Sequence, residues 1–352
     1  MNSHIFKPEC RATAIGSLPH KDPIEASAFV LKYLPLIPAV PELPQLGFRA
    51  TFCGPIMENL PALKEDNNRE IFYFNTDIDA SVELEKFYEN FLSENTEYFK
   101  ISYNRSMGLY NILDIIRNNN IKPEYIKTQI PGPITTGLTI KDNKGKSIIY
   151  NEEFMQVIIK TIIMKAKWQV EKIQKVCPEV IIFLDEPGLT NFGSSYFNLD
   201  RNYIINTINE TAGSINALTG SHCCGNTDWS LLMESELDII SFDAYTYSGA
   251  LSLYPDHLNN FLKKGGIIAW GIIPNSQEIT KCNPDLLINK LEEEINILIK
   301  FGFSKESILE SSLITPSCGL GNSSLLISKE VLSITQQVSN LLRNKYFNHV
   351  NF

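Results

Sequence analysis

Four side chains of the kind that bind transition metals follow one another along the sequence, each at or near the end of a short, β-branched apolar run. His222 and Cys224 stand one residue apart in Gly220-Ser221-His222-Cys223-Cys224-Gly225-Asn226, and Asp243 and Cys318 follow later runs. One imidazole nitrogen and two thiolates suit Zn²⁺, with a carboxylate or water in the fourth position. A zinc site with an exchangeable position is a catalytic site, so this pattern predicts an enzyme.

The local sequence around the histidine strengthens the metal hypothesis without settling it. His222 and Cys224 occupy alternate positions, so both point to the same side of an extended segment. Residues 225–228 predict the start of a helix, with Asn226 or Thr227 as its N-cap, and the dipole of such a helix favours a thiolate. An isolated His-x-Cys pair is weak evidence, because a histidine in this setting is more often a core residue. Spacing alone therefore leaves the metal and core interpretations open.

Two further motifs carry groups that suit an amino-acid substrate. Asp185 and Glu186 follow the apolar run 180–184, and two carboxylates there cannot both be core. One is expected at the mouth of the sheet and the other against a neighbouring helix; the alternative is a helix N-cap beside a surface acid. A carboxylate at the mouth would bind an ammonium group or act as an acid or base. Ile15-Gly16-Ser17 either offers backbone N–H groups to a carboxylate or forms an ordinary tight turn.

Strand-like runs alternate with longer amphipathic stretches along the whole chain. The clearest helices are expected at 152–176, 202–218, 284–301 and 328–343, and the strands at 12–16, 36–40, 125–130, 180–184, 218–222, 239–242, 267–273 and 313–315. This alternation predicts βαβ units and a parallel sheet. Eight strands without a Gly-rich linker favour a single (β/α)8 TIM barrel over residues 1–352, with an open doubly wound sheet as the alternative. No G-x-G-x-x-G motif supports dinucleotide binding.

The long segment 53–120 does not fit one βα unit. We predict an insertion between the second and third strands that covers part of the barrel mouth, with helices near 87–92 and 109–117. In a barrel, the chemistry lies where strands end. The polar residues expected at those ends are Ser17, Glu42, Gln129, Asp185 with Glu186, His222 with Cys224, Asp243, Asn275 and Cys318.

The composition excludes several classes of function. The chain has 352 residues, 43% hydrophobic and 20% charged, with a net charge of −9. A net negative charge gives the chain no overall electrostatic attraction to nucleic acid or to an anionic membrane. No run approaches the roughly 18 to 20 apolar residues of a membrane span, and the first residues lack a signal-peptide core. The seven cysteines are expected as thiols or metal ligands, with Cys10, Cys53, Cys177 and Cys282 structural or incidental, in a cytoplasmic protein.

The motifs also occur together, and in the same order, in a known family. They are Ile15-Gly16-Ser17-Leu18-Pro19, Gly132-Pro133-Ile134-Thr135, Asp185-Glu186-Pro187, His222-Cys223-Cys224, Phe242-Asp243 and Cys318-Gly319-Leu320, and they span nearly the whole chain. In these the chain resembles the catalytic barrel of cobalamin-independent methionine synthase. That superfamily also holds uroporphyrinogen decarboxylase and the zinc methyltransferases of methanogens. The His-x-Cys with a late Cys-Gly-Leu is the more specific part of the resemblance.

The resemblance implies roles for particular residues. His222, Cys224 and Cys318 would bind zinc. Asp243 falls where the family has a glutamate ligand and is one methylene shorter, so its direct ligation is an open question. Ile15, Gly16 and Ser17 would hold the carboxylate of an amino acid, and Asp185 its ammonium group. The family uses a further glutamate, for which Glu42 and Glu58 are both candidates. The family's second, N-terminal barrel has no counterpart in this sequence, which implies a stand-alone core form.

These expectations define one function and two alternatives. The expected function is a zinc-dependent methyltransferase that acts on a thiol, converting homocysteine to methionine, with Asp185 and Asp243 in the catalytic site. The expected methyl donor is methylcobalamin or a corrinoid protein, and the other partner is a small amino-acid thiol. The alternatives are a metal-free barrel like the decarboxylase and a non-catalytic homologue that binds zinc or thiols.

Overall fold

The computed structural model describes residues 6–194 and 197–347, and its centre is a curled sheet of parallel strands. Along the sheet the order is β1-β10-β9-β8-β7-β6-β4, so the first strand lies beside the last and the order never reverses. That order agrees with a barrel-like sheet and not with a doubly wound one. The strands are β1 (Arg11–Ala12), β4 (Ile126–Pro131), β6 (Val180–Asp185), β7 (Leu218–Cys223), β8 (Ile239–Phe242), β9 (Ile267–Ile273) and β10 (Ser312–Pro316).

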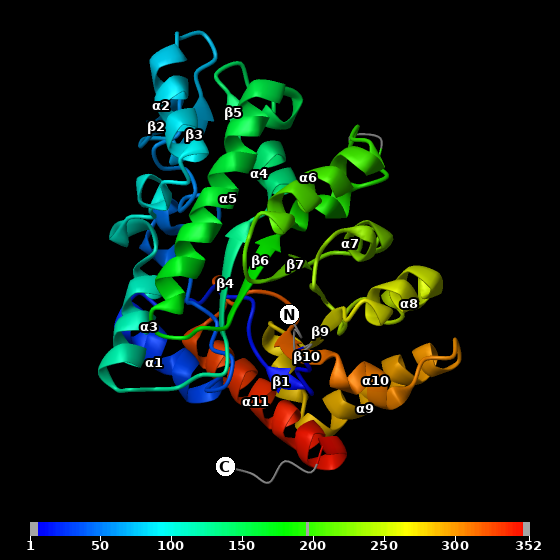
Figure 1. The fold of residues 1–352 in the computed structure, drawn as a ribbon. Helices are drawn as coiled ribbons and strands as arrows, with labels where there is room; N and C mark the ends of the chain where they lie inside the picture. Colours follow the sequence, from blue (N-terminus) through cyan, green and yellow to red (C-terminus); the bar gives the residue numbers. More distant parts are fainter. Residues whose placement is uncertain (1–5, 195–196, 348–352) are drawn as a thin grey trace.

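Most helices lie around the outer side of this sheet, whereas α2 stands away from it with the insertion (Figure 1). The helices are α1 (Pro23–Tyr33), α2 (Ser81–Leu92), α3 (Met107–Asn118), α4 (Pro133–Thr139), α5 (Glu152–Gln174), α6 (Arg201–Gly213), α7 (Ser230–Glu234), α8 (Pro255–Lys263), α9 (Pro284–Ile299), α10 (Lys305–Glu310) and α11 (Leu325–Phe347). Several begin with an acceptor side chain and a proline, as where Asp22 caps α1 and Asn283 caps α9. The predicted helices at 152–176, 202–218, 284–301 and 328–343 are confirmed, with 202–218 ending earlier, at Gly213.

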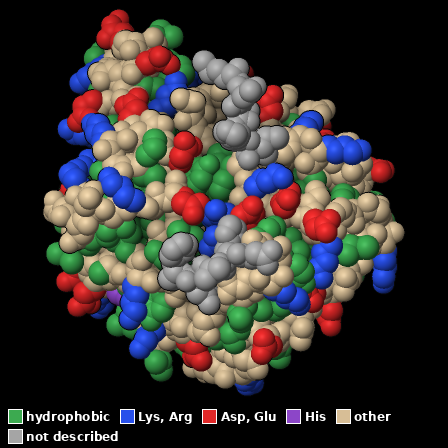
Figure 2. All heavy atoms as spheres, turned by 60° about the horizontal axis from the view of Figure 1, so that its bottom comes forward, with side chains coloured by type: hydrophobic (Ala, Val, Ile, Leu, Met, Phe, Trp, Pro, Cys, Tyr) green, Lys and Arg blue, Asp and Glu red, His purple; other side chains and the backbone are tan. Residues whose placement is uncertain are grey.

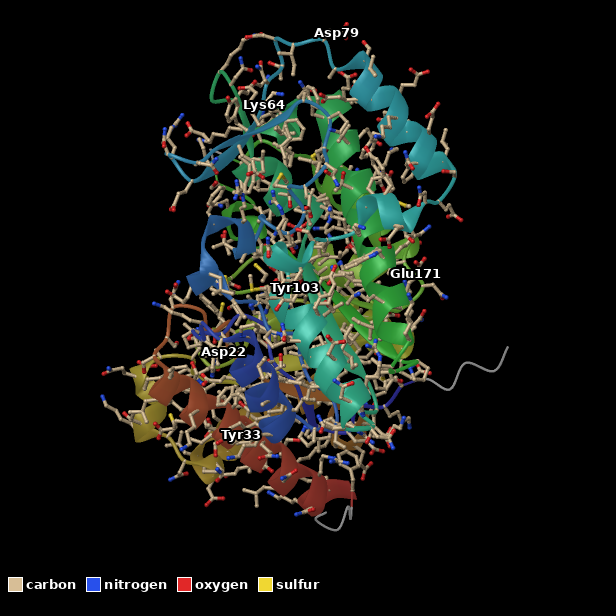
Figure 3. The ribbon with its side chains drawn as sticks, turned by 90° about the vertical axis from the view of Figure 1, so that its left-hand side faces the viewer. Asp22, Tyr33, Lys64, Asp79, Tyr103 and Glu171 are labelled. Atoms are coloured by element: carbon tan, nitrogen blue, oxygen red, sulfur yellow. The ribbon has the colours of Figure 1, made fainter. Side chains whose placement is uncertain are left out.

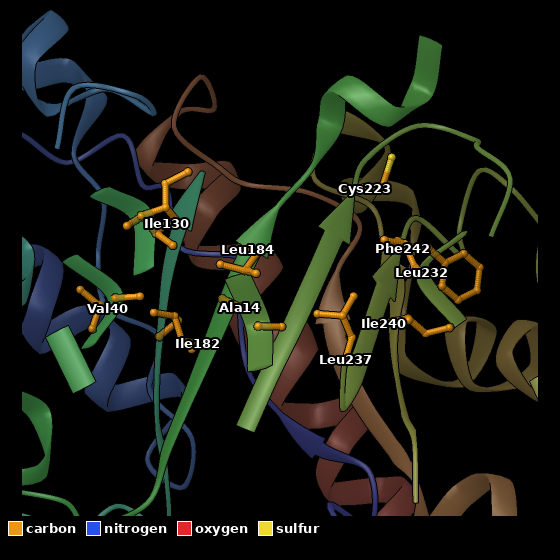
Figure 4. Packing of buried hydrophobic residues seen from close by; sticks show 14 of the residues in the cluster. Ala14, Val40, Ile130, Ile182, Leu184, Cys223, Leu232, Leu237, Ile240 and Phe242 are labelled. Carbon is orange, nitrogen blue, oxygen red and sulfur yellow. The ribbon is translucent and has the colours of Figure 1, made fainter. Parts of the chain in front are cut away.

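The two faces of the sheet pack into different cores because side chains alternate along each strand. On β6, Ile182 and Leu184 join the large outer cluster under the helices, whereas Ile181 and Phe183 join a small inner cluster. The other members of the inner cluster are Ile37, Ile239, Ile267, Ala269 and Leu313. Figure 4 shows the outer packing, with Ile182, Leu184, Cys223 and Ile240 on neighbouring strands. The same alternation places Asp185 on the inner side, two residues beyond Phe183.

The strand predicted at 36–40 does not form as a ladder. Prolines stand at positions 35, 38 and 41, and each removes a backbone donor. The segment nevertheless lies beside β4, where Lys127 N donates to Pro38 O at 2.9 Å and Val40 N donates to Lys127 O at 2.7 Å. On its other side, Glu42 N donates to Gly16 O at 3.1 Å. The eighth position is therefore held by an extended segment with isolated bridges, and the sheet counts seven strands within the described residues.

The insertion is present and carries structure that its sequence pattern did not reveal. Strands β2 (Leu63–Asp66) and β3 (Ile71–Phe74) form an antiparallel hairpin, and β3 pairs with β5 (Lys141–Asp142). Figure 3 shows this hairpin, with Lys64, beside α2 and at the opposite end of the molecule from α1. The predicted helices near 87–92 and 109–117 are confirmed as α2 and α3.

Arg105, in the 3₁₀ turn before α3, joins separate parts of the insertion to one another. Its guanidinium donates to Gly54 O at 2.7 Å and forms an ion pair with Glu65 of β2, while it lies over the ring of Phe72. The Arg105 side chain is 9% exposed, so these contacts are largely removed from water.

Charged side chains of both signs share the face of the molecule that Figure 2 shows. In the view of Figure 2, lysine and arginine side chains are interspersed with aspartate and glutamate rather than gathered into one basic patch. Among the described residues, no helix has the length and apolarity that crossing a bilayer requires.

Candidate functional site

A cavity of about 870 Å³ opens where the strands of the curled sheet end. Its wall combines the ends of β6, β7 and β10 with the turn after β1 and with Thr51 and Phe52, which lie just before the insertion. The residues in it that can do chemistry are Ser17, Glu42, Asp185, His222, Cys224, Asn275 and Cys318. The structure therefore brings together side chains that lie up to about 300 positions apart in the sequence. This is the place that a barrel-like sheet predicts for an active site.

His222 presents one nitrogen to the cavity. Its Nδ1 lies 3.0 Å from Ser241 Oγ, which fixes the ring, whereas the buried Nε2 has no hydrogen-bond partner among the described residues. Burial, reinforced by the nearby Lys127 charge, lowers the pKa of His222 to about 3. The imidazole is therefore neutral at physiological pH, which is the form that binds metal ions.

The two thiols of the cavity interact with each other. The Cys318 thiol is hydrogen-bonded to Cys224, and this bond is the main reason why the pKa of Cys224 is lowered to about 7. The same bond, together with burial, raises the pKa of Cys318. Cys223 behaves differently, because it is completely buried in the outer hydrophobic cluster. The expectation that His222 and Cys224 face the same side of the strand is confirmed, because both line the cavity. Cys223 faces the outer hydrophobic cluster.

The donor chemistry fits a thiophilic metal, although the side chains are not drawn together around one. An unpartnered imidazole nitrogen and two thiols, one of lowered pKa, line one cavity. These are the ligand types of zinc sites. Within residues 6–194 and 197–347, however, no three His, Cys, Asp or Glu side chains stand at the spacing of a metal site.

Asp185 and Glu186 separate as the sequence indicated. Asp185 lines the cavity, where burial raises its pKa well above the usual value, and its Oδ1 has no hydrogen-bond partner in the described part of the chain. Glu186 turns the other way and accepts hydrogen bonds from Ile134 N at 2.9 Å, Thr135 N at 2.7 Å and Thr135 Oγ1 at 2.5 Å. It thereby holds the first turn of α4. Asp185 alone is left with an acceptor that faces a ligand.

Of the two candidate glutamates, the structure places only one in the cavity. Glu42 lines it, and burial raises the pKa of Glu42 to about 7. Glu58 instead accepts from Ser102 N at 3.0 Å and lies 3.8 Å from the guanidinium of Arg105. Glu58 therefore belongs to the contacts of Arg105 within the insertion.

The turn at Ser17 interlocks with the end of the last strand. Leu320 N donates to Ser17 O at 2.8 Å, and Gly321 N donates to Ser17 Oγ at 3.3 Å. A Cβ atom at Gly319 would collide with Ser17 Oγ, so glycine is required there. Gly16 is equally constrained, because its φ of +143° disfavours other residues and a Cβ would collide with the side chain of Gln129. Ile15 and Ser17 line the cavity, as predicted, and Gly16 shapes the turn between them.

Two expectations near the histidine turn out differently. Asp243 does not line the cavity: its Oδ1 accepts from Thr246 N at 2.8 Å and closes the turn after β8. The N-cap predicted at Asn226 or Thr227 is wrong, because α7 begins only at Ser230, where Asp228 accepts from Ser230 N at 3.1 Å. Asp228 lies nearer to the start of α7 than Asn226 and Thr227 do, and it accepts a hydrogen bond from the first helical turn. The lowered pKa of Cys224 therefore comes from Cys318 and not from a helix dipole.

Lys127 is the residue beside the site that sequence reasoning missed. It is completely buried, and its ammonium group donates to Ile15 O at 2.7 Å and Gln129 Oε1 at 3.2 Å. A signal for it existed, because Gln129 was expected at the mouth and Lys127 lies two positions earlier on the same face of β4. The cavity wall from Thr51 and Phe52 was also missed, since nothing in that segment marks it as part of a site.

Comparison with known proteins adds a likeness of fold. No protein-family model and no curated protein sequence matches the chain. Among solved structures, a B12-independent methionine synthase from Shewanella sp. W3-18-1, in complex with selenomethionine, is similar with a TM-score of 0.56 and 14% identity, over 96% of this chain and 99% of that one. A methyltransferase from Methanosarcina mazei has a TM-score of 0.54 and 13% identity, over 91% and 86%.

A putative vitamin-B12 independent methionine synthase from Listeria monocytogenes is similar to the same degree, with a TM-score of 0.53 and 13% identity over 96% of this chain and 98% of that one. These likenesses extend over nearly the whole of the described fold, and their low identity restricts what they establish to the fold. The chain therefore has the fold of the methionine synthase-like methyltransferase barrels.

Proposed function

We propose that this protein is a zinc-dependent methyltransferase whose acceptor is an amino-acid thiol, with homocysteine as substrate and methionine as product. The observation that carries the proposal is the content of one cavity: an unpartnered imidazole nitrogen, two interacting thiols and an unpartnered carboxylate oxygen. The first three suit a soft metal, and the fourth suits an ammonium group. The likeness to methionine synthase and methyltransferase structures agrees with this chemistry.

His222, Cys224 and Cys318 would hold the zinc ion. Asp243 remains a proposed fourth ligand, for which its carboxylate would have to leave the turn at Thr246. A bound zinc ion supplies one piece of chemistry, which is to keep an acceptor sulfur in its nucleophilic thiolate form at neutral pH. Ser241 contributes by fixing the His222 ring so that Nε2 faces the cavity.

The remaining residues of the cavity would bind and orient the amino acid. Asp185 and Glu42 would accept from its ammonium group, and the turn of Ile15, Gly16 and Ser17 would hold its carboxylate. Held at both ends, the acceptor has little freedom, and positioning supplies much of the rate of a transfer reaction. The wall from Thr51 and Phe52 would limit the access of water.

For the methyl donor we propose methylcobalamin or a corrinoid protein rather than methyl-folate. A polyglutamate tail requires an extended basic surface, and in the view of Figure 2 positive and negative side chains are mixed. The cavity is open on one side, and the donor would approach there. We also propose a single catalytic domain in the cytoplasm, since all seven cysteines are free thiols and one large hydrophobic cluster spans the chain.

The test combines metal analysis with an assay. Protein purified without chelators is expected to hold about one zinc ion per chain. It is expected to convert homocysteine to methionine with methylcobalamin and not with methyl-folate. A zinc-free protein with full activity would end the zinc proposal, and a zinc-free protein without methyl transfer would favour the decarboxylase-like alternative. Bound zinc without methyl transfer to any thiol from either donor would favour a non-catalytic homologue.

A further inference from the structure

The ionisable groups at the floor of the cavity are of both signs. Glu42 and Asp185 line the cavity, and the inner face of the sheet adds the buried Lys127. Burial raises the pKa of both carboxyl groups, so they ionise most readily when a ligand ammonium group lies against them. With such a group bound, Lys127 is a positive charge that the sheet itself supplies beside two carboxylates.

Lys127 is built into this floor and is not a surface lysine that happens to lie near it. Its ammonium group lies 4.2 Å from the ring centroid of Phe183 and is hydrogen-bonded to Ile15 O and Gln129 Oε1. The Gln129 side chain in turn donates to Val40 O at 3.0 Å and abuts Gly16. The lysine thus contacts the very turn that would receive a carboxylate. Asp185 and Glu42 both raise the pKa of Lys127 against the effect of burial, which lowers it to about 8.

Electrostatics gives this charge a consequence for ligand choice. A ligand carboxylate entering the cavity approaches Asp185 and Glu42, which are ionised against the ammonium group of the same ligand, and repulsion between buried charges is strong. A positive charge fixed beneath the carboxylate-binding turn offsets that repulsion. A simple amine has no carboxylate and needs no such offset. We propose that Lys127 is a specificity-determining residue that lets the cavity accept a zwitterionic amino acid rather than a simple amine.

The proposal rests on the proposed amino-acid thiol function and is tested by a ratio of dissociation constants. Calorimetry at neutral pH would compare L-homocysteine with 3-aminopropane-1-thiol, which is the same molecule without its carboxylate. In Lys127→Met, the ratio of the homocysteine Kd to the amine Kd is expected to rise about tenfold or more. The matched control is Lys165→Met, since Lys165 is also completely buried but donates to Phe99 O and Lys100 O away from the cavity. Its ratio should equal that of the wild type.

A second pair of variants keeps the test decisive if Lys127→Met does not fold. Glu42→Gln removes one negative charge, so the ratio is expected to move in the opposite direction, towards homocysteine. The double variant Lys127→Met/Glu42→Gln removes one group of each sign, so its ratio should return towards the wild-type value. A Glu42→Gln ratio that does not move, or equal losses for both ligands in Lys127→Met, would overturn the role of Lys127. A wild type that binds neither thiol would overturn the proposed function itself.

Discussion

At the scale of single residues, the site depends on which side of a strand each side chain faces. Cys223 and Cys224 are adjacent and chemically identical, yet one is enclosed among apolar side chains and the other lines the cavity beside Cys318. The same division separates Asp185 from Glu186. Each pair therefore provides its own control, because the same substitution can be made on both sides.

The first prediction concerns the thiols. Cys224→Ser and Cys318→Ser each remove a thiolate, so bound zinc is expected to fall from about one ion per chain to a small fraction of that. Cys223→Ala should retain the metal, because its side chain lies in the outer cluster. Metal content is measured by atomic emission after dialysis. Loss of zinc in Cys223→Ala with retention in Cys224→Ser would contradict the facing of β7 in the structure.

The second prediction concerns the ammonium group. Asp185→Asn is expected to weaken homocysteine binding by about 1.5–3 kcal/mol, the usual worth of a hydrogen bond to a charged group. Coenzyme M, a thiol without an ammonium group, should lose far less. The control is Glu186→Gln, the same chemical change one residue further on, which should leave the affinity for both thiols nearly unchanged. Equal losses for the two thiols in Asp185→Asn would show that Asp185 does not recognise the ammonium group.

At the scale of elements, apolar runs and amphipathic periodicity were sufficient to locate most strands and helices. The runs at 180–184, 239–242 and 267–273 became β6, β8 and β9 almost unchanged, because a strand buried on both faces has little choice of residues. The run at 36–40 looked equally apolar. Its prolines lack the backbone N–H groups that a continuous series of strand hydrogen bonds requires, so only isolated bridges form. The hairpin of β2 and β3 was missed because Leu63–Asp66 is mostly polar and derives its order from tertiary contacts.

The third prediction concerns the packing within the insertion. Arg105→Ala removes a largely buried charged donor from Gly54 O and Glu65, so we expect a loss of about 2–3 kcal/mol in the free energy of unfolding. Arg49→Ala is the matched control, because Arg49 pairs with the same Glu65 from an exposed position, with a side chain 49% exposed. Its effect should stay within about 1 kcal/mol. Urea denaturation measures both, and equal losses would contradict the stabilising role of the buried Arg105 contacts.

At the scale of the whole molecule, several ionisable groups are buried, and their shifted pKa values make the free energy of unfolding depend on pH. Burial raises the pKa of Glu186 to about 7, above its value of 4.5 in an unfolded chain. Between these values the folded protein holds a proton that the unfolded chain has lost. The stabilisation is thus fully present below pH 4.5 and is lost as the pH rises through 7. None of these buried charges is apparent from composition, which shows only an ordinary soluble chain.

The fourth prediction follows from the raised pKa of Glu186. Glu186→Gln cannot ionise, so it does not suffer the loss of stability that ionisation of a buried carboxyl causes. The free energy of unfolding of the wild type relative to Glu186→Gln is expected to fall between pH 5 and pH 8. Urea denaturation of both proteins at the two pH values measures this difference. A difference that stays constant or grows with pH would show that the folded state does not hold the Glu186 proton more tightly than the unfolded chain does.

The hydrogen bond between Gly321 N and Ser17 Oγ joins positions 304 residues apart. A ribosome makes the chain from its first residue at about 5–20 residues per second, so Ser17 waits roughly 15 to 60 s for its partner. During that interval the Cys318 thiol does not yet exist, and Cys224 lacks the neighbour that lowers its pKa. A growing chain can therefore neither assemble the proposed metal ligands nor close the turn at Ser17. Completion of the site is confined to the time after synthesis, and metal supplied earlier would meet the proposed ligands only singly.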